Sequence, residues 1–476
     1  MNPDVISKIK FGTDGWRAVI SDTFTFENVA IVSQAISEWI HHDLKEKPGQ
    51  NGKRVAVAYD TRFLSDEYAQ IVSRVLAMNN LEVYLSDSPI PTPALSYGVV
   101  RKDCVAGVMI TASHNPGKFN GIKIKSGDGG GASKDITNAV EGYLGKTEVK
   151  TMGYEQAKAE KKILIYDFKV DYLRFIKGYL DLKKIKNAKF KVLVDAMHGS
   201  GDSLAKEILK GTQVRLTLTR EDINPYFDGG KPEPVVEYLK ETLSKVKEEK
   251  FDLGLVLDGD ADRIAAVASG GEFIHPQKIL GLLILHLVRN RGCKGGVVKT
   301  ICGTTMIDNI AKKLGLKLYE TPVGFKYISE LMVKEKIVAG GEEAGGMGLP
   351  DYIPERDGTL AGLLLLEMMV YQKKNIKKIV EEMEKEFGKY YYQRFDLKLE
   401  KGVFDLNKVK GLKELMGKKV VEVKDFDGVK LVCEDESWLM LRPSGTEPLV
   451  RAYSEAKSLA RAKQLINFGA KLLREV

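Results

Sequence analysis

The sequence has few of the features that mark secreted, membrane-spanning or thiolate-metal proteins. Its 4 cysteines are scattered among 476 residues without a Cys-x-x-Cys pair, so neither a disulfide framework nor a zinc site is indicated. The N-terminal stretch from Met1 to Lys10 is polar and has no signal-peptide pattern. The apolar run from Leu280 to Val288 is shorter than the roughly 20 residues that span a bilayer, so it predicts a buried helix. We therefore expect a cytoplasmic protein with reduced thiols.

Basic residues outnumber acidic ones, yet they form no dense tract. The net charge is +8, but lysines and arginines are mixed with acidic residues and are not interleaved with aromatic ones. This distribution favours small anionic ligands over nucleic acid, and we expect no membrane partner. The sequence also lacks a P-loop and the Gly-x-Ser-x-Gly elbow of many serine hydrolases.

Strand-like and helix-like patterns alternate over most of the chain, which has room for about three or four domains. This alternation predicts layered α/β units. The polar stretch from Gly145 to Lys162 suggests a first boundary, and a second is expected just before Asp258. After Lys373 the composition changes, and two strands precede a final helix, which predicts a smaller α+β domain. The expected domains are residues 1–154, 155–255, 256–372 and 373–476.

The segment from Thr111 to Pro116, Thr-Ala-Ser-His-Asn-Pro, carries the clearest chemical signal. It follows an apolar strand, so Ser113 is held in position by the strand and exposed by the turn. A second predicted strand, Asn120 to Lys125, could return Lys123 toward the serine. A serine beside cations is suited to carrying a phosphate. A purely structural turn is the alternative. A serine hydrolase is not favoured, because Ser113 and His114 are adjacent and the Gly-x-Ser-x-Gly motif is missing.

Three aspartates alternate in the segment Asp-Gly-Asp-Ala-Asp-Arg, which also follows an apolar strand. Asp258, Asp260 and Asp262 could converge on one divalent cation, and their oxygen ligands favour Mg²⁺ or Ca²⁺ over zinc. The glycine and glutamate that complete an EF-hand loop are missing. A hairpin turn of solvated acids is the alternative, and the position at a strand end favours the metal.

Four other loops combine glycine with charged or hydroxyl side chains. Arg442 to Pro448 joins two predicted strands, and its arginine, hydroxyls and approachable backbone could hold a phosphate. Gly340 to Gly346 carries two glutamates that could accept hydrogen bonds from sugar hydroxyls. Thr321 to Lys326 and Arg356 to Gly358 each place one cation near glycine. Ordinary polar turns are the alternative for each loop taken alone.

Together, and in this order over essentially the whole length, these motifs resemble those of the α-D-phosphohexomutase superfamily, which includes phosphoglucomutases and phosphomannomutases. Thr111 to Pro116 is similar to the phosphoserine loop and Asp258 to Asp262 to the Mg²⁺ loop. Gly341 to Gly345 resembles the sugar-binding loop and Arg442 to Thr446 the phosphate-binding loop. Phe11 to Arg17 resembles the N-terminal signature, and the resemblance places its arginine by the catalytic serine.

The resemblance implies an α/β fold, with three related α/β domains that have mixed sheets and a C-terminal α+β domain around a central cleft. It implies reversible transfer of phosphate between O1 and O6 of a hexose, with a phosphoserine at Ser113 and a 1,6-bisphosphate intermediate. Mg²⁺ is the implied cofactor, glucose 1,6-bisphosphate the activator and a phosphosugar the partner of a monomer or homodimer. The implied site residues are, for the reaction, Ser113, His114, Lys123, Arg17 and Arg263; for the metal, Ser113, Asp258, Asp260 and Asp262; and for the substrate, Gly324, Lys326, Glu342, Ala344, Arg356, Arg442, Ser444, Gly445, Thr446 and Arg451.

The sequence departs from the family pattern at two positions of the sugar loop. Ala344 stands where most relatives have serine, and Gly346 stands where many phosphomannomutases have a histidine that can transfer protons. His114, Lys123 and Arg356 remain as candidates for the general acid or base. The pair of glutamates and the aromatic residue after Gly324 are more similar to phosphoglucomutases. We therefore expect glucose to be preferred and mannose accepted.

Three alternatives to this activity remain. Phosphoglucosamine mutases usually have glutamine at the position of Glu343, so that substrate ranks third. A phosphosugar phosphatase would pass the phosphate of the same serine to water. A non-catalytic scaffolding relative would be expected to lose the serine or the metal ligands, and this sequence keeps both.

Overall fold

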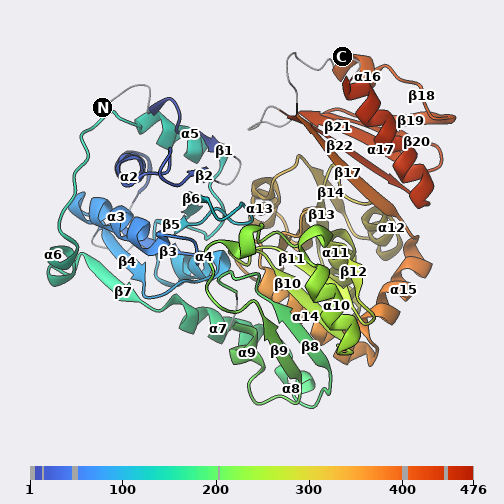
Figure 1. Cartoon of the computed structure of the whole chain (residues 1–476), viewed down its shortest axis with the longest axis horizontal. Helices are drawn as coiled ribbons and strands as arrows, with labels where there is room; N and C mark the ends of the chain where they lie inside the picture. Colours follow the sequence, from blue (N-terminus) through green and yellow to red (C-terminus); the bar gives the residue numbers. More distant parts are fainter. Residues whose placement is uncertain are drawn as a thin grey trace.

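The computed structural model describes residues 6–12, 15–45, 52–201, 204–398, 406–443 and 449–474. Four sheets follow one another along this part of the chain, and the first three have helices packed around them (Figure 1). The C-terminal sheet stands apart, at the upper right of the view, and is antiparallel. The prediction of an α/β fold with a C-terminal α+β domain is confirmed.

The first sheet has seven strands in the order β1-β2-β6-β5-β3-β4-β7 and is mixed. Its centre is parallel because the apolar strands β3, β4 and β5 are joined by crossover helices, whereas β6 returns antiparallel to β5. The strands are β1 (Phe11–Gly12), β2 (Gly15–Val19), β3 (Arg54–Tyr59), β4 (Glu82–Ser86), β5 (Ala106–Ile110), β6 (Phe119–Ser126) and β7 (Ile163–Tyr166). The helices are α2 (Phe26–Asp43), α3 (Ser65–Met78), α4 (Thr92–Arg101), α5 (Lys134–Tyr143) and α6 (Tyr154–Ala159).

The second sheet has the order β12-β11-β10-β8-β9 and carries the three aspartates on a hairpin. Its strands are β8 (Lys191–Asp195), β9 (Arg215–Thr219), β10 (Leu253–Leu257), β11 (Ile264–Ala268) and β12 (Glu272–Ile274). Its helices are α7 (Phe168–Tyr179), α8 (Leu182–Ile185), α9 (Leu204–Leu209) and α10 (Lys240–Glu248), with 3₁₀ turns at Phe227–Gly229 and Val236–Tyr238. Because β10 pairs in parallel with β8 and antiparallel with β11, a domain boundary after residue 255 would fall inside this sheet.

The third sheet has the order β14-β13-β15-β16. Its strands are β13 (Gly296–Thr300), β14 (Leu318–Thr321), β15 (Ile337–Gly341) and β16 (Met347–Gly348). Its helices are α11 (Pro276–Leu285), which continues into the π-helical turn His286–Asn290, α12 (Thr305–Leu314), α13 (Phe325–Lys334), α14 (Gly358–Gln372) and α15 (Ile376–Phe387). The predicted helix at residues 280–288 is therefore present and buried.

The fourth sheet has the order β17-β22-β21-β20-β19-β18 and packs against α17. Its strands are β17 (Tyr391–Lys398), β18 (Glu414–Leu415), β19 (Lys418–Lys424), β20 (Val429–Cys433), β21 (Trp438–Pro443) and β22 (Leu449–Ala456). Its helices are α16 (Leu406–Lys410) and α17 (Leu459–Arg474).

One continuous apolar core joins the first three sheets and fixes how their loops meet. It contains buried side chains from Ala56 in β3 to Tyr390, just before β17. Helix α14 is apolar on all sides and packs on β10, β11 and α11, as expected of a fully buried helix. The fourth sheet reaches the third through a smaller cluster that includes Cys302 and Trp438. No helix in the described ranges has both the length and the apolar composition needed to cross a membrane.

Candidate active site

Ser113 lies on the loop after β5, in a conformation that few residues other than glycine adopt. Its φ is 51°. Its side chain is fully buried, so the expectation that the turn exposes it is wrong, because the loop that carries Asp258 packs against it. Its Oγ donates a hydrogen bond to Asp258 Oδ2 at 2.8 Å and lies 3.4 Å from Nδ1 of His114. Gly259 permits this approach, because a Cβ atom there would lie 2.5 Å from the Ser113 carbonyl oxygen. The serine loop and the aspartate loop therefore face each other directly.

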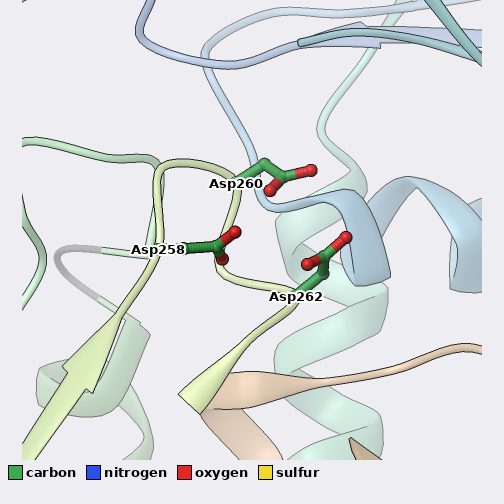
Figure 2. A group of neighbouring side chains, drawn as sticks. All are labelled: Asp258, Asp260 and Asp262. Atoms are coloured by element: carbon green, nitrogen blue, oxygen red, sulfur yellow. The ribbon is translucent and has the colours of Figure 1, made fainter. Parts of the chain in front are cut away.

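The three aspartates lie on the turn between β10 and β11, and Figure 2 shows their carboxylates turned toward a common region. One oxygen from each lies within 4.8 Å of the others, and all three side chains are buried. Lys123 donates to Asp260 Oδ2 and Asp262 Oδ2, each at 2.7 Å. Thr92 donates to Asp260 Oδ2 at 2.5 Å. β6 thus returns Lys123 to the aspartates that face the serine loop.

The aspartate group fits a divalent cation. Asp260 Oδ1 and Asp262 Oδ1 are buried and have no hydrogen-bond partner among the described residues. Burial and the neighbouring Asp262 and Asp260 hold the pKa of Asp258 well above its usual range. Burial acts in the same direction on Asp260, but Lys123 keeps the pKa of that carboxyl below its usual range. The carboxylates offer hard oxygen atoms with unused lone pairs, which are ligands that Mg²⁺ prefers. A bound Mg²⁺ would also relieve the repulsion between the three carboxylates.

Positive side chains surround the Ser113 loop. The Arg263 amide donates to Asp258 Oδ1 at 3.1 Å, and Arg17 Nη1 donates to Asn115 Oδ1 at 3.0 Å. Burial, followed by the charges of Arg263 and Arg17, holds the pKa of His114 well below its usual value. His114 is therefore neutral at physiological pH, and the cations around it form a positive field suited to a phosphoryl group.

The sugar loop meets the metal loop through Arg356. Arg356 Nη1 lies 3.1 Å from Glu342 Oε2, and its Nη2 lies 2.8 Å from Asp262 Oδ2. A Cβ atom at Gly346 would lie 2.6 Å from Arg356 Cδ and 2.9 Å from Glu342 Oε2. The space that a side chain at position 346 would need is thus filled by this ion pair. Ala344, two residues after Glu342, is partly exposed.

The third-domain loop with Gly324 and Lys326 begins helix α13. Gly324 precedes the helix with φ of 132°, a value that glycine adopts readily. Burial and the nearby Lys134 lower the pKa of Lys326. The amide of Val323 donates to Asp427 Oδ2 at 2.7 Å, which ties this loop to the fourth domain.

In the fourth domain, Arg442 on β21 and Arg451 on β22 are paired across the sheet. Asp427 Oδ1 accepts a hydrogen bond from Arg442 Nε at 2.8 Å, so one carboxylate contacts both Arg442 and the Gly324 loop. Arg451 Nε lies 3.6 Å from Asp396 Oδ2. The predicted phosphate-binding residues Ser444, Gly445 and Thr446 lie outside the described residues.

The contacts connect most of the predicted site residues into one group. It consists of Arg17, Ser113, His114, Lys123, Asp258, Asp260, Asp262, Arg263, Glu342 and Arg356. Sequence reasoning missed three buried residues beside this group, Asp60, Thr61 and Arg62. They follow the apolar strand β3 in a polar turn, which is the same signal that identified the Ser113 loop.

Comparisons with known proteins agree with this geometry. The chain matches the four domain families of phosphoglucomutase/phosphomannomutase: α/β/α domain I over residues 8–150, domain II over 170–271, domain III over 275–387 and the C-terminal domain over 373–471. It is 30% identical to a phosphoglucomutase/phosphomannomutase of Thermococcus kodakarensis, over 98% of each chain. It is also 30% identical to a phosphoglucosamine/phosphogalactosamine mutase of Sulfurisphaera tokodaii, over 96% of this chain and 97% of the relative.

The fold agrees as well. A crystal structure from Thermus thermophilus, provisionally described as a phosphomannomutase, superposes with a TM-score of 0.86 at 33% identity and covers 98% of this chain and 99% of the other. The chain therefore belongs to the phosphoglucomutase/phosphomannomutase family of the α-D-phosphohexomutase superfamily.

Proposed function

We propose that this phosphohexomutase interconverts hexose 1-phosphates and hexose 6-phosphates through a phosphoserine at Ser113, with glucose preferred and mannose also accepted. The observation that carries the proposal is the contact of Ser113 Oγ with Asp258, 2.8 Å apart, in the field of the nearby cations Arg17, Arg62, Lys123 and Arg263. This arrangement suits a serine that gives and takes a phosphoryl group, because the cations offset the charge that accumulates during transfer.

In the first transfer, the bond between phosphorus and Ser113 Oγ breaks while O6 of a hexose 1-phosphate loses its proton and bonds to phosphorus, and Ser113 Oγ takes up a proton. The products are a hexose 1,6-bisphosphate and the free serine. The intermediate then reorients, Ser113 Oγ loses its proton and bonds to the phosphorus at O1, the bond between that phosphorus and O1 breaks, and hexose 6-phosphate leaves after O1 takes up a proton. Added glucose 1,6-bisphosphate would act as activator by supplying the phosphoryl group when Ser113 is not phosphorylated.

The chain provides groups that would offset the charge of the phosphoryl group and a group that would accept a proton. Asp258, Asp260 and Asp262, together with the oxygen on Ser113, would hold Mg²⁺, which supplies positive charge beside the phosphoryl group. The side chains of Arg17, on β2, and of Arg263, directly after Asp262, would add positive charge. His114 Nδ1, 3.4 Å from Ser113 Oγ, is placed to take the serine proton in the second transfer. The other two candidates, Lys123 and Arg356, both have their charges paired with aspartates.

The remaining loops would hold the sugar and the phosphate that is not reacting. The Glu342 carboxylate would accept hydrogen bonds from sugar hydroxyls. Arg442 and Arg451, with Ser444, Gly445 and Thr446, would bind the distal phosphate, and Gly324 and Lys326 would line the same space. Because the intermediate reorients, this cradle must accept either the 1-phosphate or the 6-phosphate.

The choice of sugar separates this proposal from phosphoglucosamine mutase, the activity after which one of the relatives at 30% identity is named. Glucose and mannose differ only at C2, so a carboxylate that reaches O3 and O4 would accept both. Ala344 lacks the hydroxyl that most relatives offer, which makes sharp discrimination unexpected. We expect the enzyme to work in the cytoplasm on phosphosugars, as a monomer or homodimer.

The test is a panel of glucose, mannose and glucosamine 1-phosphates, each assayed with Mg²⁺ and the matching 1,6-bisphosphate. We expect the highest kcat/KM with glucose 1-phosphate, a lower but measurable value with mannose 1-phosphate, and no release of inorganic phosphate. Much faster turnover of glucosamine 1-phosphate would overturn the sugar assignment. Stoichiometric release of inorganic phosphate would indicate a phosphatase.

A further inference from the structure

The turn after β3 lies beside the Ser113 loop because β3 and β5 are parallel neighbours. Their last residues, Tyr59 and Ile110, are paired in register, so the two strands end at the same edge of the sheet. Asp60 and Arg62 follow β3 directly, and both side chains are at least 97% buried. We propose that Asp60, Arg62 and Thr111 are positioning residues that fix the backbone of Ser113 for phosphoryl transfer. This inference rests on the proposed role of Ser113.

The amide side of Ser113 is held through Thr111. Thr111 Oγ1 accepts a hydrogen bond from the Ser113 amide at 2.8 Å and donates its own hydrogen to Asp60 Oδ2 at 2.5 Å. Asp60 Oδ1 accepts from the Arg62 amide at 3.0 Å and from Ser65 Oγ at 3.1 Å. The hydroxyl of Thr111 is therefore oriented by a carboxylate that is itself held in place.

The carbonyl side of the loop is held by one guanidinium. Arg62 Nη2 donates to the carbonyl oxygens of Ser113 at 2.5 Å and Asn115 at 2.6 Å. Arg62 Nη1 donates to the carbonyl oxygens of Pro116 and Phe119, each at 3.0 Å. A planar fork with several donors can serve four acceptors at once, whereas a lysine ammonium is a compact point charge with three donors.

These contacts have a specific consequence for the reacting oxygen. Ser113 adopts the left-handed conformation, which persists in a non-glycine residue only when the surroundings enforce it. Both of its peptide groups are bound, one through Thr111 and one through Arg62. This backbone conformation fixes the position of Ser113 Cβ, from which Oγ donates to Asp258. Loosening the backbone should therefore slow transfer without removing any group that contacts the sugar.

The same segment also contacts the second domain. Thr61 donates to the carbonyl oxygen of His198 at 2.8 Å, and the Arg62 guanidinium lies 4.9 Å from the centre of the Phe227 ring. Asp60 and Arg62 form a buried ion pair, and loss of one partner would leave the other charge uncompensated. Variants of Thr111, which are uncharged, therefore test the inference better than truncation of Arg62 does.

The experiment compares Thr111→Val, which loses the hydroxyl, with Thr111→Ser, which keeps it. Thr212→Val is the matched control: Thr212 Oγ1 also accepts from the amide two residues later and donates to a carbonyl, but in the turn after α9. With glucose 1-phosphate, we expect Thr111→Val to lower kcat about tenfold to a hundredfold, because misplacement by about 1 Å can cost a hundredfold in rate. KM should change by less than about twofold, because ground-state contacts with the sugar are kept.

Thr111→Ser should recover most of kcat, and Thr212→Val should match the wild type. Wild-type kcat in Thr111→Val, or a Thr111→Ser variant as slow as Thr111→Val, would overturn the inference. Arg62→Lys, compared at equal amounts of folded protein, should also lower kcat, and unchanged kcat would count against the role of the guanidinium. Ser113→Ala in the same assay separates the two proposals. If it is active, the proposed function fails; if it is inactive while Thr111→Val is fast, only the positioning role fails.

Discussion

Ser113 donates its hydroxyl hydrogen to Asp258 Oδ2 across 2.8 Å, although the two residues are 145 positions apart and follow strands of different sheets. The contact forms because the loop after β5 faces the loop after β10, and the two sheets share one apolar core. It places the proposed phosphate carrier directly against the proposed metal site.

Replacement of the proposed phosphate carrier should abolish turnover. Ser113→Ala removes the oxygen that accepts the phosphoryl group, so mutase activity should fall by at least about a thousandfold while the fold is kept. The control is Ser73→Ala, which removes a buried hydroxyl that donates to the Ala69 carbonyl inside α3. Steady-state assays and circular dichroism of both variants would check this. Near-normal turnover in pure Ser113→Ala would contradict the mechanism.

Magnesium should stabilise the folded protein through the three aspartates. A ligand present at 100 times its Kd stabilises the state that binds it by about 2.7 kcal/mol, so the unfolding temperature should rise when Mg²⁺ is added. Asp262→Asn should shrink this rise, whereas Asp425→Asn, at an exposed pair with Lys410, should keep it. The measurement is thermal unfolding with EDTA and with increasing Mg²⁺. An identical rise in Asp262→Asn and the wild type would place the metal elsewhere.

Loss of Arg442 should weaken the binding of both substrate isomers by a similar factor. Hydrogen bonds to charged groups are worth about 1.5–3 kcal/mol each, so Arg442→Ala should raise KM about tenfold to a hundredfold for glucose 1-phosphate and for glucose 6-phosphate. Arg289→Ala, which breaks a surface pair with Glu386, is the control. Kinetics in both directions provide the measurement. A loss confined to one isomer would argue against a shared phosphate cradle.

A side chain at position 346 should disturb the ion pair of Glu342 and Arg356. In Gly346→Ala, the new Cβ would lie 2.6 Å from Arg356 Cδ and 2.9 Å from Glu342 Oε2, so both must move. We expect kcat/KM to fall about tenfold or more for glucose and mannose phosphates together, because a displaced binding group affects both sugars. Gly142→Ala is the control, since nothing lies within 4 Å of a Cβ there. Unchanged kinetics in Gly346→Ala would show that this pair does not orient the sugar.

Asp357 should make stability depend on pH. It caps α14 and accepts hydrogen bonds from Tyr172 and Tyr352, while burial raises its pKa to about 6 from a usual value of 3.8. The folded state then binds more protons between these values, so the free energy of unfolding falls as pH rises from about 4 to about 6, by an amount of the order of 3 kcal/mol. The Asp357→Asn variant should not show this fall in the free energy of unfolding. Urea unfolding of both proteins across this range measures it, and a pH-independent difference between them would refute the assignment.

Local sequence patterns predicted the individual elements well, because periodicity and turn residues act over a few residues. The expected strand at 120–125 lies within β6, and the expected helix at 280–288 coincides with the end of α11 and the π-helical turn that follows it. The resemblance to a family placed the site loops in order. These inferences required no knowledge of how distant segments pack.

Contacts between elements could not be predicted in the same way. The bridge that Arg356 makes between Glu342 and Asp262 depends on the docking of two sheets, and nothing in the local sequence specifies it. The expected boundary after residue 255 lies within β10, whose pairing with β8 is a long-range contact that local patterns do not reveal. Asp60 and Arg62 follow a strand in a polar turn, as Ser113 does, but their contacts with the Ser113 loop depend on the pairing of β3 with β5, which local patterns do not specify. The exact domain boundaries and the roles of the site residues stay predictions.

The most direct test of the account follows the phosphoryl group itself. Wild-type enzyme is mixed briefly with phosphorus-labelled glucose 1,6-bisphosphate and Mg²⁺, quenched, and digested for peptide analysis. We expect label on Ser113, and transfer of that label to glucose 1-phosphate on a subsequent chase, with none released as inorganic phosphate. Label on another residue, or turnover by enzyme that never becomes labelled, would contradict it.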